Sequence, residues 1–145
     1  MIIRTGEVGD RSAIAALLTE LGYPVTAAFA AASIERQLAH PDAVLLVAVS
    51  GGAVAGLISL HFIPQLALTG DFCRISYLCI SPDMRGQGIG AALEAAAAAL
   101  ARARGCDRIE LHCHARRHQA HRFYARQGYV ESPKYLQRPV LPGQT

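Results

Sequence analysis

The sequence has no Cys-x-x-Cys pair, no long apolar run and no run of acidic residues. Its four cysteines stand singly, so we interpret them as reduced core thiols of a cytoplasmic protein, without a disulfide framework. The alanine-rich stretch 91–100 is too short to span a membrane, and the Met1 end predicts a strand with no signal peptide before it. The lack of an acidic run gives no pocket for a ligand that carries several ammonium groups, such as a polyamine.

Charged residues are also few. They make up 17% of the chain against 52% hydrophobic residues, which is typical of a compact globular protein and excludes a disordered one. A length of 145 residues predicts a single domain, 1–145, with a real core. The net charge of +3 is too mild to favour nucleic acid, and an anionic small cofactor is a sufficient partner for it. We expect no nucleic-acid partner, no membrane partner and no metal site.

The most informative segment that is present is the run S-P-D-M-R-G-Q-G-I-G at 81–90. It follows an apolar, strand-like stretch and opens an alanine-rich helix. Gly86, Gly88 and Gly90 carry no side chain to keep a ligand away from the backbone, and the helix adds the positive end of its dipole. This combination favours an anion such as phosphate or pyrophosphate, and Arg85 adds a permanent positive charge.

Two interpretations of this loop compete. Gly86, Gly88 and Ala91, with Glu110 further on, satisfy a relaxed dinucleotide-binding pattern. However, only a short tail follows the next strand, where a dinucleotide-binding domain builds a second half. The alternative is R-G-x-G-x-G, with Arg85 directly before the first glycine.

Hydrophobic periodicity and turn residues predict an α/β fold with a mixed sheet, in which antiparallel hairpins join one parallel β-loop-α-β crossover. Glycines at 22, 105 and 128 are expected to end helices, and Asp10 to cap the first one. In the second helix we expect Phe29, Ile34 and Leu38 to be buried. The expected strands are 2–5, 44–49, 54–62, 71–80, 109–113, 129–131 and 135–140, and the expected helices are 11–21, 26–39, 88–104 and 117–127.

This order of elements resembles that of the GCN5-related N-acetyltransferases (GNAT). Residues 77–93 are similar to that family's strand-loop-helix cofactor motif, and A-H-R-F-Y-A-R-Q-G-Y at 120–129 is similar to its second motif, A-x-x-F-Y-x-x-x-G-[FY]. The resemblance covers nearly the whole chain and implies a central mixed β-sheet flanked by four helices. One departure is Arg117, which stands where many members carry an asparagine that helps to hold the cofactor and the tyrosine.

The resemblance implies acetyl-coenzyme A as the cofactor. Backbone N–H groups of the loop would meet its pyrophosphate, and the backbone of the preceding strand would pair with its pantetheine arm and polarise the thioester carbonyl. Tyr124 would be the general acid for the leaving thiolate, and its alternative role is a core aromatic. The cofactor-binding residues expected on this basis are Leu78, Cys79, Ile80, Arg85, Gly86, Gln87, Gly88, Ile89, Gly90, Ala91 and Arg117.

The general base stays open at this point. His61, Glu110, His112 and His114 are candidates because they lie near strands that should flank the acceptor cleft, but each fits packing or the surface as well, and water is an equal alternative. The same holds for the aromatic residues that either line an acceptor pocket or fill the core, namely Tyr23, Phe29, Phe62 and Tyr77.

The resemblance therefore predicts an N-acetyltransferase that moves an acetyl group directly, in a ternary complex, to a primary amine of a small molecule or peptide. It also suggests a homodimer. The alternatives are a degenerate acyl-CoA-binding sensor, which the retained Tyr124 disfavours, and a small nucleotide-binding protein.

Overall fold

The computed structural model describes residues 1–113, 117–132 and 136–143. Contacts divide the chain into two compact parts, Met1–Leu111 and His112–Thr145. The first part contains the strands β1 (Ile2–Thr5), β2 (Ala43–Ser50), β3 (Ala53–Ile63), β4 (Phe72–Ile80) and β5 (Arg108–Glu110), the helices α1 (Arg11–Leu21), α2 (Ala27–Ala39) and α3 (Ile89–Ala103), and the 3-10 turns η1 (Val8–Asp10) and η2 (Pro82–Met84). The second part contains α4 (His118–Arg126).

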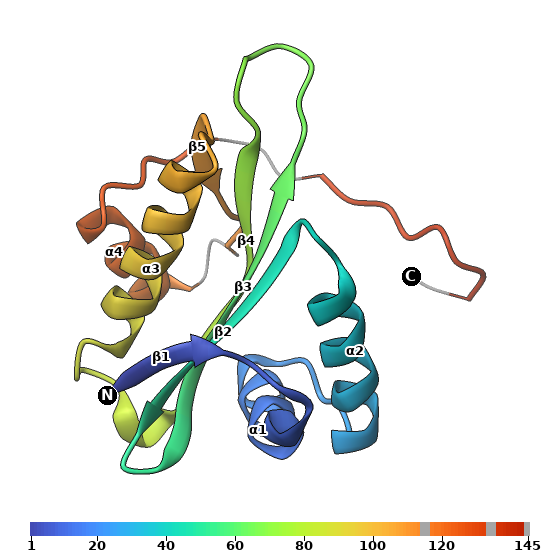
Figure 1. Cartoon of the computed structure of the whole chain (residues 1–145), viewed down its shortest axis with the longest axis vertical. Coiled ribbons are helices and arrows are strands. Elements are labelled where there is room, and N and C mark those ends of the chain that lie inside the picture. The colour runs from blue at the N-terminus through green and yellow to red at the C-terminus, as the bar shows by residue number, and fades with distance from the viewer. Residues whose placement is uncertain (114–116, 133–135, 144–145) are drawn as a thin grey trace. The chain divides into compact units, whose positions relative to one another are not determined.

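The five strands form one mixed sheet in the order β1-β2-β3-β4-β5. Neighbouring strands are antiparallel except for β4 and β5, which are parallel and are connected through α3. Helix α3 covers one face of this sheet, whereas α1 and α2 cover the other (Figure 1). The predicted mixed sheet with a single β-loop-α-β crossover is confirmed.

Both faces of the sheet are apolar, so β3 is buried on both sides. Leu57 packs on the α1 and α2 side in a cluster with Ile14, Leu17 and Ile34. Its neighbour Ile58 is fully buried and, because side chains alternate along a strand, faces α3 instead. Burial on both faces explains why residues 53–58 of β3 are apolar without alternation.

The helices end at the predicted glycines. At Gly105 the chain turns with φ +70°, Gly105 N donates to Arg102 O at 3.0 Å, and Cys106 N donates to Ala101 O at 2.9 Å. The same pair of bonds closes α1 at Gly22 and α4 at Gly128. The start of α2 is capped by Thr26, whose hydroxyl accepts from Phe29 N at 3.1 Å.

Two expectations about burial and strands are wrong. In α2 the buried stripe runs through Ala30 and Ile34, whereas Phe29 is 62% exposed and Leu38 43% exposed. A stripe through residues 30 and 34 continues to Gln37, which therefore turns inward.

The second correction concerns the C-terminal strands. Residues 129–131 and 136–140 contain no strand, and 133–135 lie outside the described residues. The N–H of Tyr129 is engaged in the closing turn of α4, where it donates to Tyr124 O at 3.0 Å. The alternation of side chains that suggested a strand there is interrupted at its first residue by a helix cap.

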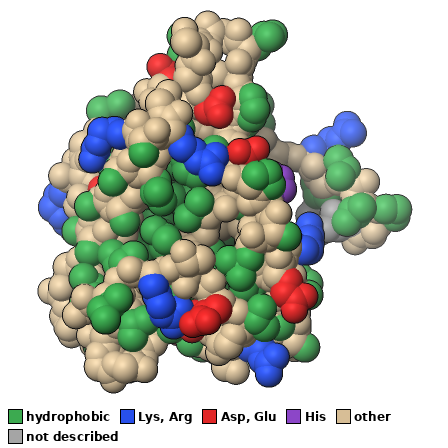
Figure 2. Space-filling view, in the orientation of Figure 1, with side chains coloured by type: hydrophobic (Ala, Val, Ile, Leu, Met, Phe, Trp, Pro, Cys, Tyr) green, Lys and Arg blue, Asp and Glu red, His purple; other side chains and the backbone are tan. Residues whose placement is uncertain are grey.

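The described residues form neither a membrane-spanning helix nor a cluster of metal ligands. Among the described residues, no helix is long and apolar enough to cross a bilayer, and no three His, Cys, Asp or Glu residues gather as metal ligands. Basic and acidic side chains are interspersed on the face seen in Figure 2.

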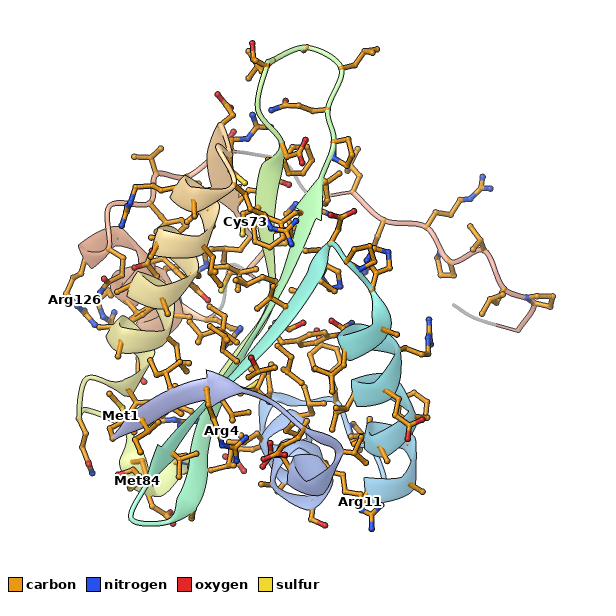
Figure 3. All side chains as sticks on the ribbon, viewed as in Figure 1. Met1, Arg4, Arg11, Cys73, Met84 and Arg126 are labelled. Carbon is orange, nitrogen blue, oxygen red and sulfur yellow. The ribbon has the colours of Figure 1, made fainter. Side chains whose placement is uncertain are left out.

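All four cysteines are free thiols, and burial raises the pKa of Cys73, on β4 (Figure 3), to about 11.

Asp10 stands at the start of α1, as expected, but its carboxylate serves a different purpose from capping the helix. It accepts two bonds from the Arg4 guanidinium, at 2.8 Å and 2.9 Å, and one from Glu7 N at 2.9 Å. The hydrogen bonds from Arg4 lower the pKa of Asp10 against the opposing effect of burial. This pair fastens β1 to the beginning of the first helix (Arg4, Figure 3).

Asp10→Asn should therefore destabilise the fold by about 1 kcal/mol at neutral pH, since it removes the charge from these hydrogen bonds at a partly exposed pair. Because the folded-state pKa lies below the unfolded one, the stabilisation is present above about pH 4 and is lost as the pH falls through the folded-state pKa. Urea unfolding of both proteins between pH 2.5 and 7 measures this. Glu20→Gln, an exposed change on the same helix, is the control, and a difference that persists unchanged at pH 2.5 would contradict the assignment.

Candidate active site

The glycine loop turns sharply between the end of β4 and the start of α3. Ser81 N donates to Ala55 O at 2.8 Å, η2 follows, and Gly86 and Gly88 then take φ values of +79° and +81°. A Cβ atom added at either glycine would meet no described atom within 4 Å, so the loop faces open space there. Side chains other than glycine rarely adopt these dihedral angles, which explains why the sequence needs glycine at both positions.

The loop presents a row of backbone donors. The first hydrogen bond of α3 runs from Ala92 N to Gly88 O at 3.0 Å, so the N–H groups of Ile89, Gly90 and Ala91 have no acceptor within the helix. The Ile89 side chain is 3% exposed and anchors the helix start in the core, whereas Arg85 and Gln87 are exposed. An anion placed at this end meets the N–H groups and the positive end of the helix dipole together.

The strand that feeds the loop has an edge that the first part leaves unpaired. Strand β5 pairs with β4 only from Phe72 to Arg74, and within residues 1–111 no strand lies along the same edge at residues 75–80. Leu78, Cys79 and Ile80 lie on this stretch, next to the loop. The Cys79 side chain is buried with Ile14 and Leu17, so the backbone is what this residue offers to a ligand.

Glycine also brings β3 close to this stretch. A Cβ atom at Gly56 would lie 2.9 Å from Ile80 Cδ1, 3.0 Å from Cys79 O and 3.3 Å from Ile89 Cγ2. The absence of a side chain at Gly56 lets the end of β4 and the start of α3 pack on the same point of β3. The edge and the donor row are thereby held at a fixed spacing.

A bulge interrupts β4 just before this stretch. Ser59 pairs with Tyr77, but the next residue of β3, Leu60, pairs with Ile75, so Ser76 is an extra residue in β4. Such a bulge re-aims side chains locally. Here it brings the hydroxyl of Ser76 within 2.6 Å of His61 Nδ1.

His61 and Ser76 line a pocket of about 420 Å³ on the α1 and α2 side of the sheet. On its other side His61 Nε2 lies 3.4 Å from Gln37 Nε2 of α2. Burial, followed by the positive charges of His40 and Arg74, lowers the pKa of His61. The pocket is lined by His40, Asp42, His61, Phe62, Ile63, Pro64, Arg74 and Ser76.

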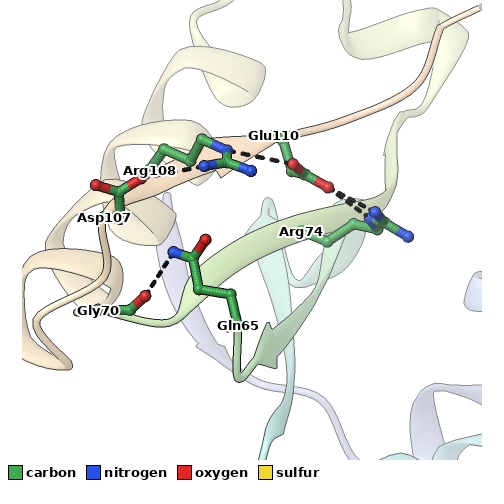
Figure 4. Close-up of polar contacts among 6 residues, drawn as sticks. All are labelled: Gln65, Gly70, Arg74, Asp107, Arg108 and Glu110. Carbon is green, nitrogen blue, oxygen red and sulfur yellow. Dashed lines mark hydrogen bonds and ion pairs between the residues drawn. The ribbon is translucent and has the colours of Figure 1, made fainter. Parts of the chain in front are cut away.

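Glu110 is held by two arginines (Figure 4). Its Oε1 accepts from Arg74 Nη2 at 2.5 Å, and its Oε2 lies 3.4 Å from Arg108 Nε. Burial alone would raise the pKa of Glu110, but the hydrogen bond and charge of Arg74, joined by Arg108, outweigh it and lower the pKa. Glu110 is therefore an ionised partner of two guanidinium groups, which weakens it as a proton acceptor.

Of the expected aromatic lining, Phe62 borders the pocket. Tyr23 and Tyr77 contact each other edge to face, with ring centroids 5.5 Å apart, and both are exposed. Phe29 is an exposed residue of α2.

The second part of the chain carries Tyr124 and Arg117. Tyr124 lies within α4, and its ring contacts Phe123 and Tyr129 at centroid distances of 5.2 Å and 5.5 Å. Arg117 is the residue before α4, and its carbonyl accepts from His121 N at 3.0 Å. His112 also belongs to this part, whereas His114 lies outside the described residues.

The sequence matches a known protein family. The profile of the acetyltransferase (GNAT) family matches residues 13–129, which include both the glycine loop and the Tyr124 motif. The chain belongs to the GNAT family. The match runs through both compact parts of the chain.

A sequence relative and two solved structures are similar to this chain. The aminoalkylphosphonate N-acetyltransferase of Salmonella typhimurium LT2 is 40% identical over 95 residues, which are 66% of this chain and 62% of that protein. A transcriptional regulator from Bacillus halodurans C-125 superposes with a TM-score of 0.86 at 24% identity, covering 96% of this chain and 99% of its own. A GNAT family acetyltransferase from Staphylococcus aureus gives 0.81 at 20% identity, covering 96% and 98%. These two structures share the fold.

Several polar residues in and around the pocket were not expected from the sequence. His61 and Glu110 were candidates, but Ser76 and Arg74 of the lining and Gln37 behind His61 were not. Gln37 lies three residues after the buried Ile34, a spacing that places both on one helix face, but the more apolar Leu38 beside it obscured this signal. Ser76 had no signal, since a bulge is not visible in the alternation of this strand.

We expect Arg74→Met to raise the pKa of Glu110, because the variant removes the guanidinium that forms its hydrogen bond. Carboxyl chemical shifts in an NMR titration measure this directly, with wild-type Glu110 titrating below 4.5. Arg36→Met, an exposed change on α2, should leave the curve in place. An unchanged Glu110 pKa in Arg74→Met would show that the ion pair does not form in solution.

Proposed function

We propose that the chain is a single acetyltransferase domain that moves an acetyl group from acetyl-CoA to the primary amine of a small acceptor. The observation that carries this is the continuity of two features. The edge of β4 along which residues 1–111 place no further strand leads directly into the open glycine loop and to the first N–H groups of α3, which have no acceptor within the helix. A cofactor with a strand-like amide arm and a pyrophosphate at one end fits this sequence of groups.

Each part of acetyl-CoA has a proposed set of residues to hold it. The N–H groups of Gln87, Gly88, Ile89, Gly90 and Ala91 would hold the pyrophosphate, and Gly86 leaves room for it, with Arg85 as an added positive charge. The backbone of Leu78, Cys79 and Ile80 would bond to the amides of the pantetheine arm as a further strand would. The cofactor supplies an activated thioester, whose carbonyl oxygen would accept from a backbone N–H of β4.

Tyr124 completes the proposed chemistry. A phenol, with a pKa of about 10 in solution, is close enough to a thiol in acidity to protonate the departing sulfur. Arg117 is proposed as a phosphate contact in place of the usual asparagine. Transfer is direct in a ternary complex, with Cys79 excluded as a carrier because its side chain is packed in the core.

For the acceptor we propose a small amine that also carries an acidic group. The relative of this chain from Salmonella typhimurium is named for aminoalkylphosphonates, although the matched segment covers only 62% of that protein. The pocket beside β4 offers the guanidinium of Arg74 as a cationic group for a phosphonate or similar anion. Release of thiol with such an acceptor separates this proposal from an acyl-CoA sensor. A homodimer and a cytoplasmic location stay predictions.

Acetyl-CoA titration followed by calorimetry tests the cofactor site. Gly88→Ala should weaken binding at least tenfold, because its new methyl group points into the space that the pyrophosphate needs. Gly105→Ala is the matched control, since it has a similar φ of +70° at the other end of α3 and also faces open space. Both variants should lose about 1 kcal/mol of stability from the left-handed backbone. Equal affinities in the two variants, or a preference of the wild type for NAD, would reject the cofactor assignment.

Tyr124→Phe should bind acetyl-CoA normally and lower kcat for thiol release about 100-fold, since it removes only the acidic proton. Tyr129→Phe is the control, because the family motif accepts either ring at that position and Tyr129 contacts the same cluster. Turnover of Tyr124→Phe at the wild-type rate across the pH range would exclude the role.

A further inference from the structure

A chain of three polar side chains from three elements reaches the pocket beside β4, which His61 and Ser76 line. Gln37 of α2, His61 of β3 and Ser76 of β4 follow one another, with 3.4 Å between Gln37 Nε2 and His61 Nε2 and 2.6 Å between His61 Nδ1 and Ser76 Oγ. We propose that His61 accepts the proton of the acceptor amine through the hydroxyl of Ser76. This inference rests on the proposed function, because it identifies the base for that reaction.

Ser76 lies where its hydroxyl can pass a proton from the acceptor amine to His61. His61 lies on β3, the strand next to β4, and neighbouring strands are about 4.8 Å apart. An acetyl-CoA arm laid along Ile80, Cys79 and Leu78 directs its thioester toward Tyr77 and Ser76. The bulge turns the hydroxyl of Ser76 toward the ring of His61, so this hydroxyl lies between the expected position of the thioester and that ring.

The surroundings of His61 keep a lone pair on its ring. The charged and titratable groups around it are His40 from the end of α2, Asp42 from the turn before β2, Arg74 from β4, and Glu110 from β5 behind Arg74. Asp42 is engaged by Arg104 at 3.1 Å, and Glu110 by Arg74. Burial and the two cationic neighbours therefore dominate and lower the pKa of His61, and the same positive charges disfavour the ammonium form of a bound acceptor.

Both partners of His61 suit a group that gains and loses a proton. A hydroxyl and an amide can each donate or accept, so they can satisfy either the neutral or the protonated ring. Gln37 Oε1 is buried and has no hydrogen-bond partner among the described residues. A relay that ends on His61 Nδ1 needs the ring proton on Nε2, so the Gln37 amide must turn its oxygen toward Nε2–H, an arrangement that serves the neutral and the charged ring alike. Glu110, in contrast, has two guanidinium partners that only donate.

The proton balance is as follows. The acceptor ammonium gives one proton to Ser76 Oγ while the Ser76 hydroxyl proton passes to His61 Nδ1. The freed nitrogen lone pair forms the C–N bond with the carbonyl carbon, the C–S bond breaks, and Tyr124 protonates the sulfur. The second nitrogen proton restores Tyr124, and His61 returns its proton to solvent.

The first test is an NMR titration of the histidine rings in the full chain, which needs no acceptor. We expect His61 to titrate below 6.5, and Ser76→Ala to move its curve. A His61 ring that keeps its proton above pH 7 would be largely protonated at neutral pH and would overturn the proposal.

The second test measures thiol release from acetyl-CoA with 2-aminoethylphosphonate as the acceptor probe. His61→Gln should lower kcat about 100-fold at pH 7 and abolish the acid limb of the pH profile, and Ser76→Ala should lower kcat at least tenfold. Imidazole should restore activity to His61→Ala in proportion to its neutral form. Ser59→Ala, which removes a buried hydroxyl on the same side of the sheet, is the control and should keep the acid limb.

Acetyl-CoA titration of His61→Gln separates this proposal from the proposed function. Unchanged affinity with lost turnover supports the role of His61. A loss of equal size at every pH, with the acid limb in place and no rescue by imidazole, would make His61 a packing residue. Failure of the wild type itself to bind acetyl-CoA would reject the proposed function, whatever the titration of His61.

Discussion

The early end of the pairing between β4 and β5 is the constraint on which the site depends. The two strands share three residue pairs, and β4 then continues for six residues along which the first part of the chain provides no further strand. Backbone amides at such an edge require partners from elsewhere. The glycine loop, the donor row of α3 and the bulge at Ser76 all belong to this strand or follow it directly, so one element organises both halves of the proposed chemistry.

The sheet, the crossover and the helix ends could be predicted from the sequence because their signals are local. Gly22, Gly105 and Gly128 end their helices through the same turn, which depends on a few neighbouring residues. The loop at 81–90 was predictable for a similar reason, since a strand, alternate glycines and an alanine-rich helix are contiguous in the chain. Gly86 and Gly88 have the positive φ values that only glycine adopts readily.

The pocket could not be predicted in the same way, because its contacts join residues far apart in the chain. Cys73, Ile75 and Cys79 are all odd-numbered and buried, which suggests one face of a regular strand. The bulge instead divides them, since Cys79 packs with Ile14 on one side of the sheet while Ile75 pairs with Leu60, which faces the other. Gln37 was overlooked because Leu38 beside it is more apolar, and the strand predicted at 129–131 was overridden by the closing turn of α4 at Tyr129.

The extra residue in β4 also affects how this protein can change during evolution. Tyr77 pairs with Ser59 and Ile75 with Leu60, the next residue of β3, so deleting residue 76 would restore a regular ladder and leave both halves of β4 on their present faces. Arg74 would stay at the pocket, and Cys73 and Ile75 would stay in the core. A substitution or a deletion at position 76 therefore removes the hydroxyl beside His61 without exchanging core and pocket residues. The bulge lets the pocket change independently of the packing of the sheet.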